Sequence, residues 1–166
     1  MAGAAPSHWA SANRKTGSMP ELRLRSELHR RGYRFRKNLL IREPGLCVRP
    51  DVVFPRLRLA IFVDGCFWHS CPNHGRAPSS NPTYWPAKLA GNVSRDSRVD
   101  RLLRDAGWQV VRLWEHISPA EGADEVATAI EAARSFTGGP VREVRPHSYG
   151  AANVAALRAQ EAPVHK

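Results

Sequence analysis

Apolar residues recur at helical spacing in some stretches of the chain and alternate or run together in others. The helical spacing predicts three helices, at residues 18–32, 84–106 and about 118–136. Ser18 and Ser118 are each followed three residues later by glutamate, which is the capping-box pattern of a helix start.

The other apolar runs have the length and composition of strands. Buried strands are predicted at residues 51–54, 59–63 and 109–114, and a tight turn joins the first two into a hairpin. Residues 33–36 alternate apolar and basic side chains, as a half-exposed strand does, and the chain around Pro44 is predicted to be a loop. The order α-β-β-β-α-β-α indicates an α/β fold with one mixed sheet flanked by helices.

Composition separates one domain from two basic ends. Residues 1–17 are small, polar and basic without periodicity, and we expect a flexible arm there. The domain is expected to span residues 18–136, and residues 137–166 are expected to form a tail that is either disordered or a short helix. A chain of 166 residues is long enough to bury a core in a single domain.

The charge balance restricts the class of partner. Lys and Arg total 25 against 15 Asp and Glu, which gives a net charge of +10 with the histidines neutral. Such an excess attracts polyanions, so nucleic acid is the leading partner and an anionic membrane surface is the second. There is no long apolar run and no signal-peptide core, and 3 cysteines are unlike a disulfide framework. We therefore expect a cytoplasmic protein without a membrane segment.

Thiols and imidazoles gather in the predicted loop at residues 64–83. Cys66, Cys71 and His74 lie close together there, and His116 follows the last predicted strand. Structural zinc takes four sulfur or nitrogen ligands in a tetrahedron, so these residues would form a Cys2His2 site that ties the loop to the end of a core strand. The alternative is that the cysteines are buried as small apolar residues and the histidines lie on the surface.

Two acidic residues stand at the ends of the predicted hairpin strands. Asp51 begins the first of these strands and Asp64 follows the second. Carboxylates in such positions can share a hard cation such as Mg²⁺, and a buried strand-end acid is costly unless it is used. Glu21 and Asp96 are further candidates, although a capping box explains Glu21 and a solvated helix face explains Asp96.

His69 is a candidate general base as well as a reserve zinc ligand. The unperturbed pKa of histidine is about 6.5, so the ring can be neutral and still accept a proton at working pH. A carboxylate such as Asp96 would fix its tautomer. Together with a divalent ion at the phosphate, this set suits phosphodiester hydrolysis.

Aromatic residues lie among these polar ones. Phe67 and Trp68 are inside the ligand loop, and Tyr84 and Trp85 begin the long helix. Rings fixed between metal ligands can be presented outward and inserted between base pairs, although core packing explains each ring taken singly. Arginines at i+3 spacing in the long helix either follow a phosphate backbone or form a solvated face: Arg95, Arg98, Arg101 and Arg104.

Several segments together resemble the very-short-patch mismatch repair (Vsr-type) endonucleases of bacteria. The matching pieces are MPELRLRSELHRRGYRFR, RPDVVFP, AIFVDGCFWHSC and TYWPAKLAGNVSRDSRVDRLLRDAGWQVVRLWEH, in this order over about residues 14–118. GCFWH after an apolar strand, followed by NV-x-RD in the next helix, is specific in combination. The resemblance implies a restriction-endonuclease-like fold, a mixed central sheet flanked by helices, with a structural zinc ion. It also implies Mg²⁺-dependent nicking of one strand beside the thymine of a T·G mismatch.

The resemblance also implies roles for individual residues. Asp51 looks like the metal-binding aspartate, and Glu21 looks like the carboxylate that supports the water shell of the metal. His69 looks like the base, with Asp96 as its carboxylate partner. The wedge inserted beside the mismatch would consist of three aromatic side chains: Phe67, Trp68 and Trp85.

Three features depart from the best-known form of the family. Asp64 stands where that form has a histidine, so we expect Asp64 to be a second Mg²⁺ ligand and not a proton donor. The zinc set is poorer in cysteine than in that form, and the tail after about residue 137 has no recognised counterpart.

The leading hypothesis is a monomeric mismatch endonuclease that acts on double-stranded DNA in the bacterial cytoplasm, at the nucleoid. One alternative is a less selective, restriction-type endonuclease of the same fold. The other is a zinc-stabilised DNA-binding module without hydrolysis, for which a strand-end acid at Asp51 has no use.

Overall fold

The computed structural model describes residues 17–75, 81 and 84–135. The predicted arm and tail lie outside these residues, except for Gly17, as do several residues of the predicted loop at 64–83. Among the described residues, no helix is both long and apolar enough to cross a bilayer.

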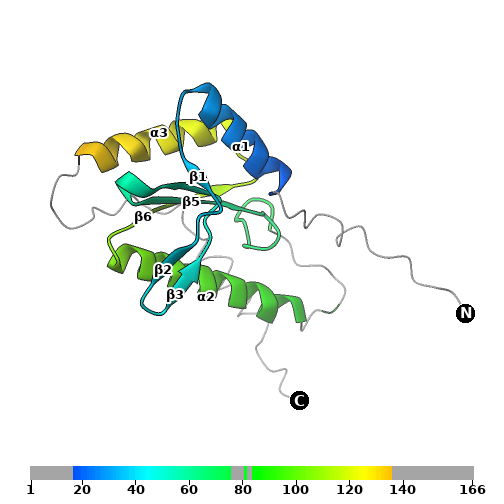
Figure 1. The fold of residues 1–166 in the computed structure, drawn as a ribbon. Coiled ribbons are helices and arrows are strands. Elements are labelled where there is room, and N and C mark those ends of the chain that lie inside the picture. Colours follow the sequence, from blue (N-terminus) through cyan, green and yellow to red (C-terminus); the bar gives the residue numbers. More distant parts are fainter. Residues whose placement is uncertain (1–16, 76–80, 82–83, 136–166) are drawn as a thin grey trace, which may run out of the picture.

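The central sheet has the strand order β1-β4-β5-β6 (Figure 1). Its strands are β1 (Arg36–Lys37), β4 (Val52–Phe54), β5 (Leu59–Asp64) and β6 (Gln109–Trp114). β4 pairs antiparallel with both β1 and β5, whereas β5 and β6 are parallel, so the sheet is mixed as predicted. A parallel pair needs a long crossover, and helix α2 (Tyr84–Asp105) supplies it.

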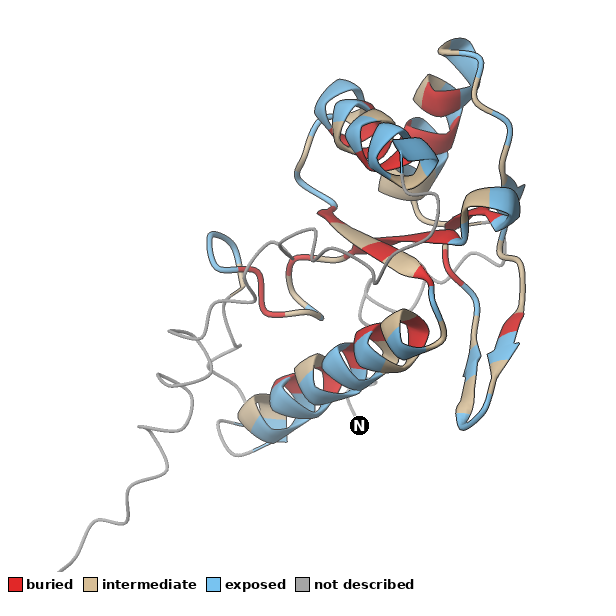
Figure 2. Ribbon diagram, turned by 90° about the vertical axis from the view of Figure 1, so that its left-hand side faces the viewer, coloured by how far each residue is buried: buried red, intermediate tan, exposed pale blue. Residues whose placement is uncertain are grey.

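Helices cover both faces of the sheet (Figures 1 and 2). α1 (Met19–Arg30) and α3 (Pro119–Ser135) pack together on one face, and α2 lies on the other. Because side chains alternate across a strand, β5 contributes Leu59 and Ile61 to the α1/α3 side and Ala60 and Phe62 to the α2 side. Both faces of β5 are therefore buried, which explains its continuous apolar sequence.

The three helices and the hairpin were predicted at nearly their observed positions. β4 and β5 are joined by a short 3-10 helix, η2 (Pro55–Leu57), and Arg58 at the turn has φ 47°. The predicted strand at residues 33–36 is nearly absent, because β1 pairs only at Arg36 and Lys37. Short strands depend on their partners, which a local pattern does not reveal.

Pro44 and Gly45 lie in a turn, but the rest of the predicted loop around them contains two strands that were not predicted. The chain forms a second hairpin there, from β2 (Ile41–Glu43) and β3 (Leu46–Val48), which turns at Gly45 with φ 72°. Ile41 is buried in the α2-side core, and this contact holds the hairpin against the domain. The alternation in such short strands is too brief to distinguish them from a loop.

The two predicted capping boxes have different outcomes. At α3 the amide of Glu121 donates to Ser118 Oγ (3.2 Å), and the amide of Ser118 donates to Glu121 Oε2 (3.1 Å). At α1, Ser18 makes no side-chain cap hydrogen bond with the described residues, and Glu21 instead pairs with Arg25. The carboxylate of Glu21 thus forms an i,i+4 ion pair within α1 and does not cap the helix.

The carboxyl ends of β5 and β6 meet at one edge of the sheet because these strands are parallel. The antiparallel strand β4 begins at the same edge, where the amide of Asp51 donates to the carbonyl of Ile61 (3.0 Å). The segments that follow β5 and β6 therefore converge near Asp51, and the predicted site residues lie on them.

Candidate active site

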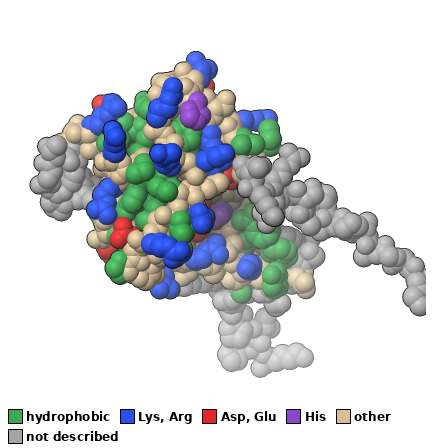
Figure 3. Space-filling model, in the orientation of Figure 1, with side chains coloured by type: hydrophobic (Ala, Val, Ile, Leu, Met, Phe, Trp, Pro, Cys, Tyr) green, Lys and Arg blue, Asp and Glu red, His purple; other side chains and the backbone are tan. Residues whose placement is uncertain are grey.

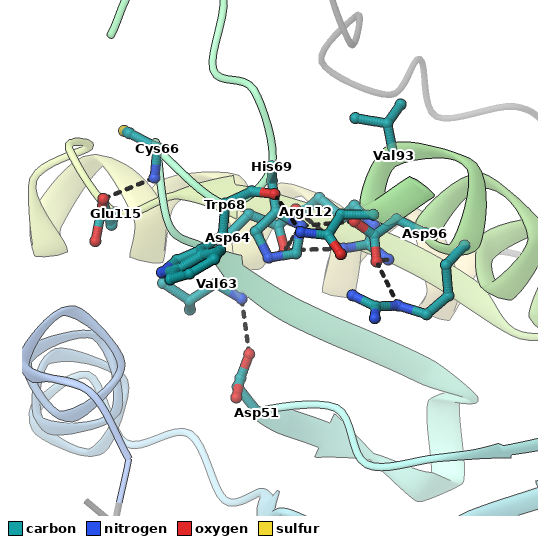
Figure 4. A network of polar contacts seen from close by, with 12 residues as sticks. Asp51, Val63, Asp64, Cys66, Trp68, His69, Val93, Asp96, Arg112 and Glu115 are labelled. Carbon is teal, nitrogen blue, oxygen red and sulfur yellow. Dashed lines mark hydrogen bonds and ion pairs between the residues drawn. The ribbon is translucent and has the colours of Figure 1, made fainter. Parts of the chain in front are cut away.

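Asp51 points toward Val63, near the end of β5, in Figure 4, and Asp64, His69, Asp96 and Arg112 lie together beside that end. Its Oδ2 accepts a hydrogen bond from the amide of Val63 (2.8 Å). The hydrogen bond fixes the carboxylate at the point where the strand gives way to the loop.

Burial raises the pKa of Asp51 to about 7, and the nearby carboxylates of Glu21 and Asp64 add to this effect. The Val63 amide and the Arg25 guanidinium lower the pKa but do not cancel the increase. A bound cation stabilises the ionised form of a buried carboxylate. The electrostatic environment of Asp51 is therefore suited to binding a metal ion.

Arg25 connects α1 to the start of β4. It donates to the main-chain oxygen of Asp51 from Nε (3.2 Å) and Nη2 (2.9 Å), and Nη2 also lies 3.3 Å from Glu21 Oε2. Sequence analysis did not single out Arg25, although it shares the buried stripe of α1 with Leu24 and Leu28. A charged residue on a buried stripe is itself a signal, because it requires a partner.

His69 and Asp96 meet as predicted. Nδ1 of His69 lies 2.6 Å from Oδ2 of Asp96 and 3.7 Å from Oδ1 of Asp64. A proton on Nδ1 that is shared with Asp96 leaves the lone pair of Nε2 available to accept another proton. The contact with Asp96 thus favours the tautomer in which Nδ1 carries the proton.

Asp96 lies on a buried polar stripe of α2 and not on a solvated face. Asn92, Asp96 and Asp100 follow one another at i+4 spacing, and each is 7% exposed or less. Asn92 donates from Nδ2 to the main-chain oxygen of Trp68 (3.0 Å), which holds the loop onto the helix. The i+4 spacing of these three residues is present in the sequence, but the neighbouring basic residues favoured the interpretation of a solvated face.

Asp64 is held by an arginine that sequence analysis missed. Nη1 of Arg112 donates to both carboxylate oxygens of Asp64, at 2.8 and 3.0 Å. Arg112 interrupts the apolar sequence of β6, which is the local sign of a buried charge with a dedicated partner. The role of Asp64 as a Mg²⁺ ligand stays a prediction, in which one carboxylate serves both the arginine and the cation.

The aromatic residues form one cluster beside these polar groups. Ring centroids lie 4.9 Å apart for Phe67 and Trp68, 5.3 Å for Phe67 and Trp85, and 6.1 Å for Trp68 and Trp85. Tyr84 packs edge-on against Trp85 at 5.2 Å. Trp68 remains 46% exposed and Tyr84 54%, so the cluster presents apolar surface outward.

The predicted zinc ligands converge: Cys66, Cys71, His74 and His116 each offer an atom, and these atoms all lie within 4.8 Å of one another. Their sulfur-to-Nδ1 distances run from 3.0 to 3.9 Å, and the two Nδ1 atoms are 3.3 Å apart. A tetrahedral zinc site with ordinary bond lengths requires edges of about 3.3 to 3.8 Å. The donor set and its spacing therefore fit a structural zinc ion.

Burial, followed by the neighbouring Cys71 thiol, raises the pKa of Cys66 to about 12. Two thiolates side by side need a cation, and a bound divalent ion would reverse this shift. Glu115 Oε1 accepts a hydrogen bond from the Cys66 amide (2.7 Å), which joins the start of the loop to the chain after β6 (Figure 4). Cys47 lies apart from the cluster as an exposed free thiol.

The arginine stripe of α2 is partly solvated. Arg95, Arg98 and Arg101 are exposed, whereas Arg104 is half-buried and lies 3.8 Å from Asp100. Lys and Arg side chains also border the hydrophobic surface visible in Figure 3. The described surface is thus rich in cations suited to a polyanion.

Comparison with known proteins gives this arrangement a family. A family model described as DNA mismatch endonuclease Vsr matches residues 4–73. The type II nicking enzyme V.NaeI of Lentzea aerocolonigenes is 50% identical over 121 residues, which cover 72% of this chain and 71% of that protein. The chain belongs to the Vsr family.

Other relatives agree with this membership. The type II nicking enzyme V.XorIIP of Xanthomonas oryzae is 41% identical over 104 residues, with 61% of this chain and 73% of that protein covered. The DNA mismatch endonuclease Vsr of Escherichia coli is 37% identical over 98 residues, with 57% and 59% covered. The prediction of a Vsr-type DNA endonuclease is confirmed at this level.

The span matched by the Vsr family model includes Glu21, Asp51 and His69 but ends before Asp96 and Arg112. Contacts in the structure nevertheless join Asp96 to His69 and Arg112 to Asp64. The candidate site of this Vsr-family protein is thus assembled from five separate parts of the chain: α1, the start of β4, the end of β5 with the loop after it, α2 and β6.

Proposed function

We propose that this Vsr-family protein is a Mg²⁺-dependent mismatch endonuclease that nicks one DNA strand beside the thymine of a T·G pair. The observation that supports it best is a juxtaposition. A metal-suited carboxylate, Asp51, lies at the same edge of the sheet as the His69–Asp96 pair and the cluster of Phe67, Trp68 and Trp85. The names of the relatives, which describe nicking enzymes and a mismatch endonuclease, agree with this activity.

Asp51 and Asp64 are the residues that would hold Mg²⁺. Their carboxylate oxygens are the donors that this ion prefers. The raised pKa of Asp51 reflects first its burial and then the nearby carboxylates of Glu21 and Asp64, and a bound cation would offset both effects. When bound, Mg²⁺ supplies positive charge at the scissile phosphate. Glu21 lies close enough to Asp51 to raise its pKa, and it would orient water around the ion.

His69 is the proposed general base. Asp96 holds the Nδ1 proton, and Nε2 accepts a proton from the water that attacks phosphorus. The bond from phosphorus to the leaving oxygen then breaks, and that oxygen takes a proton from solvent water, which completes the cut in one strand. The two-fold role of Asp96, as a hydrogen-bond acceptor and a negative charge, also stabilises the imidazolium that forms.

The aromatic cluster is the proposed mismatch reader. A T·G wobble pair is easier to unstack than a matched pair, so insertion of rings between base steps is least costly at the lesion. Trp68 is the most exposed of the three wedge residues and is the ring that would enter first. Selectivity would thus come from the energy of deforming DNA.

Zinc is the proposed ion at the Cys2His2 cluster, since its four donors have the types and spacing of a closed structural site. It would hold the segment with Phe67, Trp68 and His69 between two of its ligands, Cys66 and Cys71. The loop has little apolar core of its own, so the ion would supply rigidity.

We further infer a restriction-endonuclease-like fold for residues 18–136, with an N-terminal arm (1–17) and a basic C-terminal tail (137–166). The mixed sheet with an antiparallel β4–β5 pair, a parallel β5–β6 pair and flanking helices supports the fold. The proposed working form is a monomer in the bacterial cytoplasm, at the nucleoid.

The test is a nicking assay with Mg²⁺ on a duplex containing T·G and on the matched T·A duplex. Wild type is expected to cut one strand of the T·G duplex, and Asp51→Ala is expected to lose at least about 100-fold in rate. Equal cutting of both duplexes would support a restriction-type enzyme instead. Binding without Mg²⁺-dependent cutting, unchanged in Asp51→Ala, would support a DNA-binding module.

A further inference from the structure

Arg112 occupies the centre of a buried group of carboxylates at the candidate site. Asp64, Asp96 and Asp100 are each 5% exposed or less, and the side chain of Arg112 is 9% exposed. Buried carboxylates are unfavourable unless a cation and hydrogen bonds compensate them. Arg112 is a cation that lies within ion-pair distance of all three carboxylates.

Each edge of the Arg112 guanidinium faces a different carboxylate. Nη1 donates to both oxygens of Asp64 (2.8 and 3.0 Å), and Nε donates to Oδ1 of Asp100 (2.9 Å). Nη2 lies 3.6 Å from Oδ1 of Asp96, an ion-pair distance. The flat side of the guanidinium lies over the Phe62 ring, 4.5 Å from its centroid.

Phe62 and Arg112 are directly paired residues of β5 and β6, so the sheet itself sets this stacking. The guanidinium is thus fixed by a ring on one strand and by carboxylates on the strand end and on α2. Its position leaves little rotational freedom, because a planar fork can meet three acceptors in only one orientation.

Two of these three carboxylates also contact His69. Asp96 Oδ2 and Asp64 Oδ1 lie 2.6 and 3.7 Å from the same ring nitrogen, Nδ1. The other oxygen of Asp96 and both oxygens of Asp64 face Arg112. Any rotation of the guanidinium would therefore move the groups that hold the imidazole.

We propose that Arg112 is a positioning residue for the endonuclease reaction: it fixes Asp64 and Asp96 around His69 so that Nδ1 carries the proton and Nε2 faces the DNA. Arg112 acts through these residues and does not itself touch the substrate. Asp100 anchors the arginine from the next turn of α2. This inference deepens the proposed function and rests on it.

Lysine cannot replace Arg112 in this role. Its ammonium is a compact point charge that retains the +1 but has neither the fork that reaches three carboxylates nor the flat face that stacks on Phe62. Arg112→Lys therefore separates the geometry of the guanidinium from its charge. Arg104→Lys is the matched control, because Arg104 also faces Asp100, at 3.8 Å, from a half-buried position.

The first measurement is the imidazole ¹⁵N NMR spectrum of the full zinc-loaded chain, at a pH where His69 is neutral. Wild type is expected to show His69 with its proton on Nδ1. In Arg112→Lys we expect that tautomer to lose its dominance, while the signals of His74 and His116 stay in place and report an intact cluster. Arg104→Lys is expected to match wild type.

The second measurement is single-turnover nicking of a T·G duplex with Mg²⁺, together with DNA affinity. Arg112→Lys is expected to lower the cleavage rate by about 10- to 100-fold and to change the dissociation constant by less than about 3-fold. In a His69→Ala background the same substitution should lower the residual rate by a smaller factor than in wild type, because part of its effect acts through His69.

The inference is overturned if Arg112→Lys retains both the Nδ1 tautomer and the wild-type rate, or if its rate loss persists undiminished in the His69→Ala background. If Arg112→Lys fails to fold, Asp100→Asn provides the test, since it keeps size and an acceptor for Nε. A smaller population of the Nδ1-protonated tautomer of His69, together with a rate loss of about 3- to 10-fold at constant affinity, would support the inference. Wild-type behaviour of Asp100→Asn in both measurements would overturn it.

The spectroscopic arm separates this inference from the proposed function. If the tautomer shifts as expected but wild type does not nick T·G duplexes, Arg112 still positions His69 and the proposed function fails alone. If wild type nicks and Arg112→Lys changes neither the tautomer nor the nicking rate, the positioning role fails alone.

Discussion

At the scale of single residues, the site contains a carboxylate whose ionised form is destabilised by burial, and this lowers the free energy of unfolding. Asp51 keeps a pKa of about 7 because burial and neighbouring carboxylates disfavour its ionised form. Such tension between stability and charge is common where a carboxylate serves chemistry and not folding.

This tension predicts that Asp51→Asn stabilises the Mg²⁺-free protein. The folded pKa lies above the usual value of 3.8, so the folded state binds more protons than the unfolded state between about pH 4 and 7, and its stability falls as pH rises through that window. Asparagine cannot ionise and escapes this loss. We expect Asp51→Asn to gain about 2 kcal/mol at pH 8, and less at pH 5.5, after discounting for partial solvent access.

Urea unfolding at the two pH values, without Mg²⁺, checks this expectation. Excess Mg²⁺ should reduce the difference at pH 8, because a bound cation favours the ionised aspartate of wild type. A stability difference that is the same at both pH values would contradict a raised folded pKa.

At the scale of elements, two contrasts in the chain provide paired tests. The serines before α1 and α3 both begin capping-box patterns, but only the pattern at Ser118 becomes a pair of hydrogen bonds among the described residues. Ser118→Ala is therefore expected to lower the free energy of unfolding by about 1 kcal/mol, and Ser18→Ala to change it by less than about 0.3 kcal/mol. Chemical denaturation of both variants measures the difference, and equal losses would argue against the contrast.

The loop after β5 is expected to depend on the proposed zinc ligands. Cys66→Ser is expected to lower the free energy of unfolding by at least about 2 kcal/mol, because the energy of binding a structural metal is folding energy. Cys47→Ser is the matched control, since Cys47 is an exposed free thiol, and it should unfold like wild type. Elemental analysis should find one zinc per wild-type chain, and a chain purified without zinc would refute the assignment.

At the scale of the whole molecule, we expect the net charge to determine the overall affinity for DNA and the aromatic cluster to determine the preference for the mismatch. With a net charge of +10, binding to any duplex should weaken steeply with salt, because each phosphate contact releases counterions. Ring insertion releases none, so the ratio of affinities for T·G over T·A duplexes should change by less than about 3-fold between 50 and 200 mM salt. Trp68→Ala should lower that ratio and leave the salt slope unchanged, and a uniform loss on all duplexes would count against insertion.

The sequence allowed most of the frame of this molecule to be predicted, because its elements are strongly patterned. The helix at residues 84–106 and the hairpin of Asp51 and Asp64 carry long or uninterrupted apolar signals, and the structure has them. The hairpin of β2 and β3 could not be predicted, since its short strands gain their stability from tertiary contact at Ile41.

The same limit applied to the site. The ligand residues and the His69–Asp96 pair could be named from residue type and family resemblance, and the structure brings them together. Arg25 and Arg112 could not, because their partners are distant in sequence: Arg25 donates to the main-chain oxygen of Asp51, and Arg112 donates to the carboxylate of Asp64. A charged residue inside an apolar strand or stripe indicates that it has a partner, but it does not reveal which residue the partner is.

Phe67, Trp68 and His69 all lie between the first two cysteines of the Cys2His2 cluster. On the proposed roles, one clamp holds both the rings that find a lesion and the base that cuts beside it. Loss of the ion would then abolish mismatch recognition and strand cleavage together. A molecule that lost its ion would become inactive and would not become a nonspecific nuclease. The chain order within this short loop would serve as a fail-safe.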